Sequence, residues 1–376
     1  MTVAPAPTLL AARIDAVLAG FVDGQRLLWP DDDLRPMLDT VRRFILTGGK
    51  RLRPAFCYWA WRGVAAPEER GEDQAAVTAG AALELFHCFA LIHDDIIDAG
   101  SRRRGQASMH EEFAAAHARH GWRGDARSFG RNTALLCGDL CAMWAEELLT
   151  GCPTAPVRLA QAQRLFAVMR AEAVAGEYLE VVAQAMGDFG DGARQRAARV
   201  VQLKTARYSV VRPLQIGAVL AGASDAVLDG LAAFGEPLGE AFQLRDDVLG
   251  VFGDPARTGK SVLDDLRQAK PTTLLAEAFA RGMCDRVRCC RRTWGIRRWT
   301  RRARPGCGRC WPSRGRWRRW RSGSRRPVPR RCGRWSSWMW RRSRGRRWGR
   351  WPTSWRADRC EPTGSLTFPL RTPISS

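Results

Sequence analysis

Apolar residues recur at helical spacing along most of the chain, up to about residue 283. Spacings of three and four residues are typical of amphipathic helices, and no strand-like alternation is sustained. Helices are expected at the following positions: 8–22, 34–46, 52–64, 74–98, 108–119, 131–149, 156–186, 193–220, 225–252 and 272–281. Pro54 fits the first turn of the third of these helices. The pattern predicts an all-α bundle in which the mostly apolar helix at 74–98 is central.

This pattern ends near residue 283, where the chain becomes a different kind of sequence. Residues 286–357 contain 27 Arg and 11 of the 16 Trp, with no Lys, Asp or Glu. Removing this local charge of +27 from the total of +23 leaves −4, an ordinary value for a globular protein. We therefore divide the chain into a helical domain, 1–283, and an atypical tail rich in Arg and Trp, 284–376.

Three interpretations of the tail are open. Arg and Trp together suit a disordered nucleic-acid-binding segment, in which Arg contacts phosphate and Trp stacks on bases. They also suit a segment that lies on a membrane surface. The third interpretation, which we favour, is a shifted reading frame, because a GC-rich Leu-Ala-Glu run read one base later encodes Trp-Arg. The last helices of the bundle would then be missing or scrambled, which would expose apolar surface and lower solubility or activity.

Cysteine usage follows the same division. Five of the 12 cysteines lie singly before residue 283, as small core residues do in a reducing compartment. Cys307 and Cys310 form a lone C-x-x-C without a second pair or a downstream His, which is weak evidence for zinc. The first residues lack a basic start followed by an apolar core, so we expect a cytoplasmic protein with neither a signal peptide nor a membrane span.

Two acidic clusters lie inside apolar runs, LIHDDIID at 91–98 and FQLRDDVLG at 242–250. Asp94 and Asp98 are four residues apart and share one helix face, with Asp95 beside them. Burying carboxylates among apolar residues is costly unless they are paired or hold a metal ion. Oxygen ligands at this density suit Mg²⁺, which is usually held by carboxylates together with substrate phosphates. The clusters therefore predict two walls of one cavity that binds a diphosphate.

Basic residues suited to phosphate accompany these clusters. The loop TGGKRLRP at 47–54 presents Lys50, Arg51 and Arg53 after two glycines, which let backbone approach a ligand closely. A helix cap with solvated charges explains this loop equally well. Three arginines follow the first acidic cluster in SRRRG at 101–105, and they could simply neutralise its aspartates. A site for a metal-bound diphosphate, however, needs both signs of charge together.

These motifs together resemble those of the trans-isoprenyl diphosphate synthases, the polyprenyl synthetase family, over roughly residues 8–283. LIHDDIIDAGSRRRG at 91–105 is similar to the first aspartate-rich motif of that family, and LGEAFQLRDDVLG at 238–250 to the second. GGKRLRP resembles the loop that binds isopentenyl diphosphate, LKTA at 203–206 the Lys-Thr element, and TGKSVLDDLRQAKPTTL at 258–274 the later lysine region. The five motifs occur in the family's order and spacing.

The resemblance implies an isoprenoid-synthase bundle of helices around a central cavity. It also implies a head-to-tail condensation of isopentenyl diphosphate with an allylic diphosphate, with Mg²⁺ as cofactor at three ions per site. The products would be diphosphate and a short-chain prenyl diphosphate, C20 or else C15. Family members are usually homodimers, and no nucleic-acid partner is expected.

The resemblance also implies roles for individual residues. The aspartates would hold Mg²⁺ on two sides of the allylic diphosphate and so be catalytic: Asp94, Asp95, Asp98, Asp246 and Asp247. The allylic substrate would be bound by Arg103, Lys204, Thr205, Gln243, Lys260 and Lys270, of which the first two also count as catalytic. Isopentenyl diphosphate would be bound by Lys50, Arg53, His87 and Arg104. Without the motif, His87 would be interpreted as a core histidine.

Phe89 lies five residues before Asp94, just over one helical turn from the expected metal site. A bulky residue there resembles the floor that stops chain growth in this family, and Ala90 is small at the next position. The pattern is most similar to a geranylgeranyl diphosphate synthase, with a farnesyl diphosphate synthase next. The simpler interpretation is that Phe89 only packs in the core. Gly250 stands where some family members carry a third aspartate of the second motif.

Three other functions compete with the synthase. A class I terpene cyclase shares the first aspartate motif and the all-α fold, but normally replaces the second motif and does not need the GGKRLRP loop. A non-catalytic subunit of a heteromeric synthase usually loses aspartates, and none of the first motif is lost here. A nucleic-acid-binding protein rests on the tail alone.

The frame-shift interpretation makes a prediction about the coding DNA. Translation of one alternative frame from near codon 284 should restore a sequence rich in Ala and Leu with amphipathic spacing. Sequencing this region checks it, and the interpretation is wrong if neither alternative frame contains such a pattern.

Overall fold

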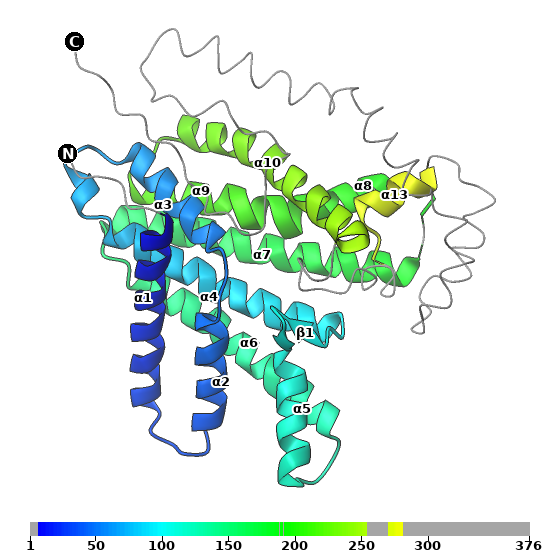
Figure 1. Cartoon of the computed structure of the whole chain (residues 1–376). Coiled ribbons are helices and arrows are strands. Elements are labelled where there is room, and N and C mark those ends of the chain that lie inside the picture. Colours follow the sequence, from blue (N-terminus) through cyan, green and yellow to red (C-terminus); the bar gives the residue numbers. More distant parts are fainter. Residues whose placement is uncertain (1–6, 188, 191, 254–269, 281–376) are drawn as a thin grey trace. The chain divides into compact units, whose positions relative to one another are not determined.

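The computed structural model describes residues 7–187, 189–190, 192–253 and 270–280, which form a bundle of helices with one small hairpin (Figure 1). The predicted all-α class is confirmed for this part of the chain. Lys260 and the predicted tail at 284–376 lie outside the described residues.

The elements follow one another in this order. The first part contains α1 (Pro7–Leu28), α2 (Arg35–Leu46), α3 (Leu52–Val64), the 3₁₀ turn η1 (Glu69–Gly71) and α4 (Gln74–Ile97). The hairpin strands β1 (Arg102–Arg103) and β2 (Gln106–Ala107) come next, before α5 (Met109–His120) and α6 (Ala126–Thr150). The remainder contains α7 (Pro156–Met186), α8 (Ala193–Val200), η2 (Val201–Val211), α9 (Arg212–Leu220), α10 (Asp225–Phe252) and α13 (Thr273–Ala280).

Local signals in the sequence set several helix ends. The side chain of Asp125 accepts a hydrogen bond from the Ser128 amide at 2.7 Å, and α6 begins at this cap. Gly121 and Gly187 follow α5 and α7 in the left-handed conformation, which glycine adopts without steric penalty. Pro156 occupies the first turn of α7, where its missing amide leaves no helical hydrogen bond unmade.

α4 is the core helix, as predicted. Every side chain from Ala75 to Phe86 is buried, and α1, α3, α6 and α9 pack around this helix. Each fully buried Leu or Phe contributes roughly 1.5–3 kcal/mol relative to exposure, so α4 anchors the bundle. α4 is the one helix among the described residues that is long and apolar enough to cross a membrane, but 78% of its apolar window is buried by its neighbours, as in a globular core.

The helix predicted at 193–220 is helical throughout, but its middle is not α-helical. α8 and α9 are α-helical, but Val201–Val211 between them form a π-helix with i→i+5 hydrogen bonds. Pro213 supplies a reason at one end, because it lacks the amide that would bond to Ser209 in a continuous α-helix. The π-helix is rare and frequently marks a functional site.

Glycines on both neighbouring helices let η2 lie close to them. A Cβ atom at Gly176 of α7 would be 2.6 Å from the backbone nitrogen of Lys204. A Cβ atom at Gly239 of α10 would be 2.4 Å from the Cα atom of Ala206. Any larger residue at either glycine would push η2 away, so these two contacts set its position between α7 and α10.

Charged side chains fix the C-terminal half of η2. Glu172 of α7 accepts hydrogen bonds from Arg207 at 2.7 Å and from Arg212 at 2.8 Å. Burial opposes ionisation of Glu172, but the two guanidinium groups outweigh it and lower the pKa of this carboxyl. Glu236 of α10 lies 3.4 Å from Arg207, which ties η2 to its other neighbour as well.

The arginine-rich segment that follows the first acidic cluster forms a hairpin that the sequence did not indicate. Arg102 pairs with Ala107 and Arg103 with Gln106. At the turn between the strands, φ is 52° at Arg104 and 78° at the following glycine, the two positive values that a type I′ hairpin turn requires.

We expect Gly176→Ala to destabilise the fold, because its methyl group would meet the backbone of Lys204. Overpacking of this kind typically costs about 1–3 kcal/mol, which urea unfolding measures. Gly20→Ala is the control, since a Cβ atom there meets no heavy atom within 4 Å on α1. That control should gain about 0.5–1 kcal/mol from its better helix propensity. Equal midpoints for Gly176→Ala and the unaltered chain would contradict the close packing.

Candidate active site

The first acidic cluster lies at the C-terminal end of α4, where Arg103 of the hairpin closes over it. The Nη2 atom of Arg103 donates to Asp94 at 2.8 Å and to Asp95 at 2.6 Å, and its Nε atom lies 3.0 Å from Asp95. Both aspartates were predicted to surround a diphosphate with this arginine, and the structure brings the three side chains together.

Two lysines from distant segments complete this charge cluster. Lys204 of η2 reaches the Oδ1 atom of Asp94 at 3.1 Å. Lys270, just before α13, contacts Asp98. Hairpin, π-helix and the segment before α13 therefore each bring one cation to the aspartates.

Burial and pairing determine how these groups ionise. Burial raises the pKa values of Asp95 and Asp98. It acts on Asp94 too, but the two lysines and Arg103 outweigh it and lower the pKa of that carboxyl. Burial opposes the charge on the lysines, yet the surrounding carboxylates outweigh it and raise their pKa values. The cluster is held together by opposite charges in a poorly solvated place.

Lys204 also contacts acidic side chains that the sequence did not single out. Its ammonium lies 2.6 Å from Glu177 and contacts Glu180, both on α7. Their spacing of three residues places them on one face of the helix. The spacing is visible in the sequence GEYLE, but no local signal shows which face of α7 turns toward the aspartates.

The second acidic cluster, on α10, is connected to the first through η2. Asp247 is buried and accepts a hydrogen bond from Gln243 at 2.8 Å. The amide oxygen of Gln243 accepts one from Thr205 at 2.6 Å. Since Thr205 follows Lys204 directly, adjacent residues of η2 contact the two clusters. Asp246 is exposed on α10.

These carboxylates have the donor chemistry of a magnesium site. Within the described ranges, no group of three or more His, Cys, Asp or Glu side chains is placed to hold a metal ion, and cationic side chains contact the acidic oxygens of the first cluster. Buried carboxylates need such compensation from a cation of some kind. Oxygen-only donors suit Mg²⁺, and the paired Arg and Lys side chains suit the phosphates that accompany it. The residues present therefore fit a metal-bound diphosphate.

A second group of predicted residues lies where α3, α4 and η2 meet. Arg53 donates to Ser209 at 2.7 Å, and its guanidinium lies 4.4 Å above the ring centre of Tyr208. The hydroxyl of Tyr208 lies 3.0 Å from Nδ1 of His87. The Nε atom of Arg53 is buried and has no hydrogen-bond partner in the part of the chain that the structure describes. An anionic oxygen would satisfy this donor.

His87 lies in a positively charged environment. Burial first, and then the charges of Arg53, Arg104 and Arg103, lower the pKa of His87 well below its usual range. The imidazole is therefore neutral at pH 7 and acts through hydrogen bonding. Because the imidazole is neutral and the surrounding arginines are positively charged, this place favours a negatively charged ligand.

The loop between α2 and α3 depends on a buried arginine. The sequence left open whether Arg51 faces phosphate or solvent, and the structure shows neither. Arg51 is 4% exposed, adopts a left-handed conformation with φ 47°, and binds Glu84 at 2.6 Å and Asp15 at 2.8 Å. Lys50, the preceding residue, is exposed. Arg51 therefore fixes the loop, and Lys50 remains accessible.

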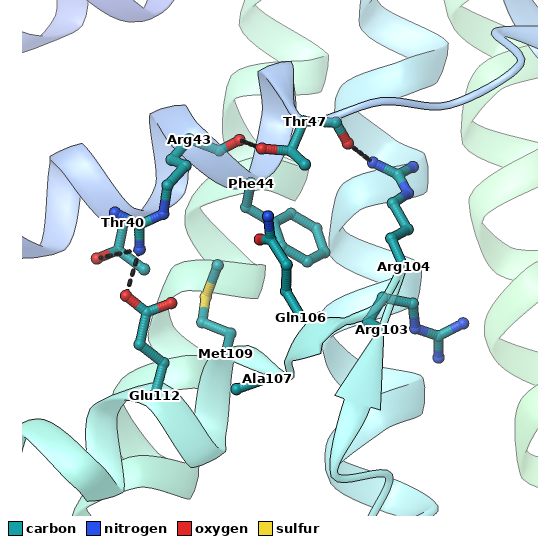
Figure 2. A pocket seen from close by; sticks show the side chains of 10 residues that line it. All are labelled: Thr40, Arg43, Phe44, Thr47, Arg103, Arg104, Gln106, Ala107, Met109 and Glu112. Atoms are coloured by element: carbon teal, nitrogen blue, oxygen red, sulfur yellow. Dashed lines mark hydrogen bonds and ion pairs between the residues drawn. The ribbon is translucent and has the colours of Figure 1, made fainter. Parts of the chain in front are cut away.

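Figure 2 shows a hollow beside the hairpin, between α2 and α5. Its lining consists of Thr40, Arg43, Phe44, Thr47, Arg103, Arg104, Gln106, Ala107, Met109 and Glu112. Arg104 crosses to the carbonyl oxygen of Thr47, and Arg43 contacts Glu112, while the guanidinium of Arg103 points away from the hollow. The hollow does not lie between the acidic clusters, so ion pairs rather than this space define the candidate site.

Phe89 is partly buried and packs against the core next to the first acidic cluster. Its ring centre is 5.0 Å from that of Phe86 and 4.5 Å from that of His93. His93 in turn lies 3.2 Å from the carbonyl oxygen of Leu135 on α6. His93, which directly precedes Asp94, therefore links α4 to α6, and Phe89 packs against it one turn earlier.

We expect Glu84→Gln to destabilise the protein by about 3 kcal/mol, because it removes the buried one of the two carboxylate charges that compensate Arg51. Glu84 is only 2% exposed, so water cannot take its place. Urea unfolding measures the loss. Glu68→Gln, at an exposed position, is the matched control and should be neutral. A midpoint for Glu84→Gln equal to that of the control would show that Arg51 does not depend on this partner.

The chain matches the family model described as polyprenyl synthetase over residues 35–291. It is 31% identical over 278 residues to a (2E,6E)-farnesyl diphosphate synthase of Mycobacterium tuberculosis, covering 73% of this chain and 68% of the relative. It is 30% identical over 245 residues to a geranylgeranyl diphosphate synthase of Methanosarcina mazei, covering 64% and 67%. An octaprenyl diphosphate synthase of Escherichia coli is 30% identical over 244 residues, covering 65% and 66%.

Solved structures show the same similarity. A geranylgeranyl pyrophosphate synthase from Corynebacterium glutamicum, complexed with isoprenyl diphosphate and magnesium, has a TM-score of 0.72 and 32% sequence identity. The match covers 80% of this chain and 88% of that one. The helical bundle expected from the sequence is confirmed by this similarity.

Proposed function

The chain belongs to the polyprenyl synthetase family of prenyltransferases, and from this we propose that it joins isopentenyl diphosphate head to tail to an allylic diphosphate in a Mg²⁺-dependent reaction. The observation that carries the proposal is the convergence of Arg103, Lys204 and Lys270 on the aspartates at the end of α4. Cations and carboxylates placed together in this way suit a diphosphate held through metal ions.

The aspartates of both clusters would hold the metal, at three ions per site: Asp94, Asp95, Asp98, Asp246 and Asp247. Bound Mg²⁺ supplies positive charge that makes the allylic diphosphate a leaving group. Lys204, Lys270 and Arg103 neutralise the remaining oxygens, since each already lies against a carboxylate of the site. Thr205 and Gln243 orient the diphosphate from η2 and α10. Lys260 is assigned to the same substrate because its motif resembles the later lysine region of the family.

The reaction needs no protein nucleophile. The C–O bond of the allylic diphosphate breaks, and the electron pair leaves with diphosphate. The double bond of isopentenyl diphosphate then attacks the allylic carbocation, and loss of one proton, to the departing diphosphate, restores a double bond. Aromatic and aliphatic side chains around Phe86 and Phe89 keep water from the cation.

Isopentenyl diphosphate would occupy the second group of residues. The buried Nε atom of Arg53 offers a donor, neutral His87 a further hydrogen bond, and exposed Lys50 and Arg104 positive charge at the entrance. The contacts of Tyr208 with both Arg53 and His87 support this assignment, because they hold these two side chains beside one another.

The product we propose is geranylgeranyl diphosphate, with farnesyl diphosphate as the shorter alternative. The relatives' names range from farnesyl to octaprenyl, so family membership does not fix chain length. Phe89 supports a short product, because its ring packs with Phe86 one turn before the aspartates and can end the space for the growing chain.

We propose that residues 284–376 are a separate, frame-shifted tail.

We also propose that the chain acts as a homodimer in the cytoplasm. On α6, Leu136 and Met143 are 62% and 67% exposed. Exposed apolar side chains of this kind suit burial against a second copy.

The condensation assay tests the proposed function. The full chain, given isopentenyl and farnesyl diphosphates, should release diphosphate only with Mg²⁺ present. A chain with its tail restored from an alternative frame is the reference and should be faster. Asp94→Asn should lower kcat by about a thousandfold, because it removes a charge from the metal site. Asp229→Asn, exposed on α10, is the control. Turnover without Mg²⁺, or by Asp94→Asn at the control's rate, would contradict the proposal.

Phe89→Ala should lengthen the product, because it opens the space beyond the allylic chain. Chromatography of the dephosphorylated products measures chain length. Phe21→Ala, in the core contact between α1 and Trp144, removes an equal volume elsewhere and should leave product length unchanged. If Phe89→Ala made a product of the same chain length as the unaltered enzyme, Phe89 would not be the residue that limits chain length.

A further inference from the structure

We infer that Glu177 and Glu180 are positioning residues for Lys204, holding its ammonium against α7 when Asp94 turns to the metal-bound diphosphate. The inference rests on the proposed function, because that function assigns Asp94 to Mg²⁺. Neither glutamate belongs to the aspartate clusters, and both act through the lysine that they contact.

The geometry consists of one ammonium among three carboxylates. Lys204 lies 3.1 Å from Asp94 and 2.6 Å from Glu177, and it also contacts Glu180. Each of these side chains is less than a quarter exposed. An ammonium has three donors, so all three contacts can be made at once.

Asp94 serves two cations, and this creates the need for a second anchor. Its Oδ1 atom accepts from Lys204 and its Oδ2 atom from Arg103. A divalent cation on Asp94 would compete for the same oxygens and repel the ammonium. A lysine tethered by Asp94 alone would then be displaced, because its long side chain has many rotamers. Glu177 and Glu180 keep a negative charge on the far side of the ammonium.

The backbone places this pair where it can act. Gly176 directly precedes Glu177 and brings α7 within van der Waals distance of the Lys204 backbone. Glu180 follows one turn later on the same face. The lysine, already fixed in η2, therefore extends between α7 and α4, with glutamates on one side and Asp94 on the other.

Binding of inorganic diphosphate tests the inference without requiring turnover. Isothermal titration is done on the full chain with Mg²⁺ in excess, using Glu177→Gln, Glu180→Gln and the double variant. Glutamine keeps the shape and removes the charge. The double variant should bind about tenfold more weakly, and each single variant about threefold, through a less ordered Lys204. Glu240→Gln, exposed on α10, is the matched control and should not change affinity.

The same changes in a Lys204→Met background separate positioning from a general effect on the fold. If both glutamates act through Lys204, the double change should alter affinity there by less than about twofold. The inference is overturned if the double change lowers diphosphate affinity equally in both backgrounds, or if it does not lower affinity in the protein that retains Lys204. The proposed function stands in either case. If the unaltered chain binds no magnesium diphosphate, the proposed function falls, and the inference with it.

Discussion

Aspartates buried at the end of α4 require positive charge nearby, and the site is organised around this requirement. Burial disfavours their charged form and raises the pKa values of Asp95 and Asp98. Arg103, Lys204 and Lys270 supply the compensating charge from three separate segments. When a metal-bound diphosphate arrives, its metal ions would replace these basic side chains at the aspartates, and its phosphate oxygens would pair with the basic side chains. The resting site therefore already contains the charges that the proposed reaction uses.

The irregular backbone lies between the two clusters. Lys204 and Thr205, at adjacent positions of this π-helix, contact Asp94 of the first cluster and Gln243 of the second. Gly176 and Gly239 then let α7 and α10 approach closely enough for Lys204 and Thr205 to reach their partners. The hairpin likewise directs two adjacent arginines to different partners. Arg103 contacts Asp94 and Asp95, and Arg104 contacts the carbonyl oxygen of Thr47.

Helical periodicity was sufficient to predict most of the bundle, and α10 spans Asp225–Phe252, within the bounds expected from spacing. The aspartates and their cations were predictable because residue type and order carry that information. The π-helix was not, although Pro213 was a signal that the helical hydrogen bonds would be interrupted. Arg51 and Glu177 depend on which helices pack together, and a single sequence contains no local signal for that packing.

A crystal structure of the full chain with Mg²⁺ and inorganic diphosphate tests the central claim most directly. The account predicts metal ions on carboxylates of both clusters, with Arg103 and Lys270 moved from the aspartates to phosphate oxygens. Lys204 should have left Asp94 for the diphosphate. Cations still paired with Asp94, Asp95 and Asp98, with diphosphate bound elsewhere, would contradict the account.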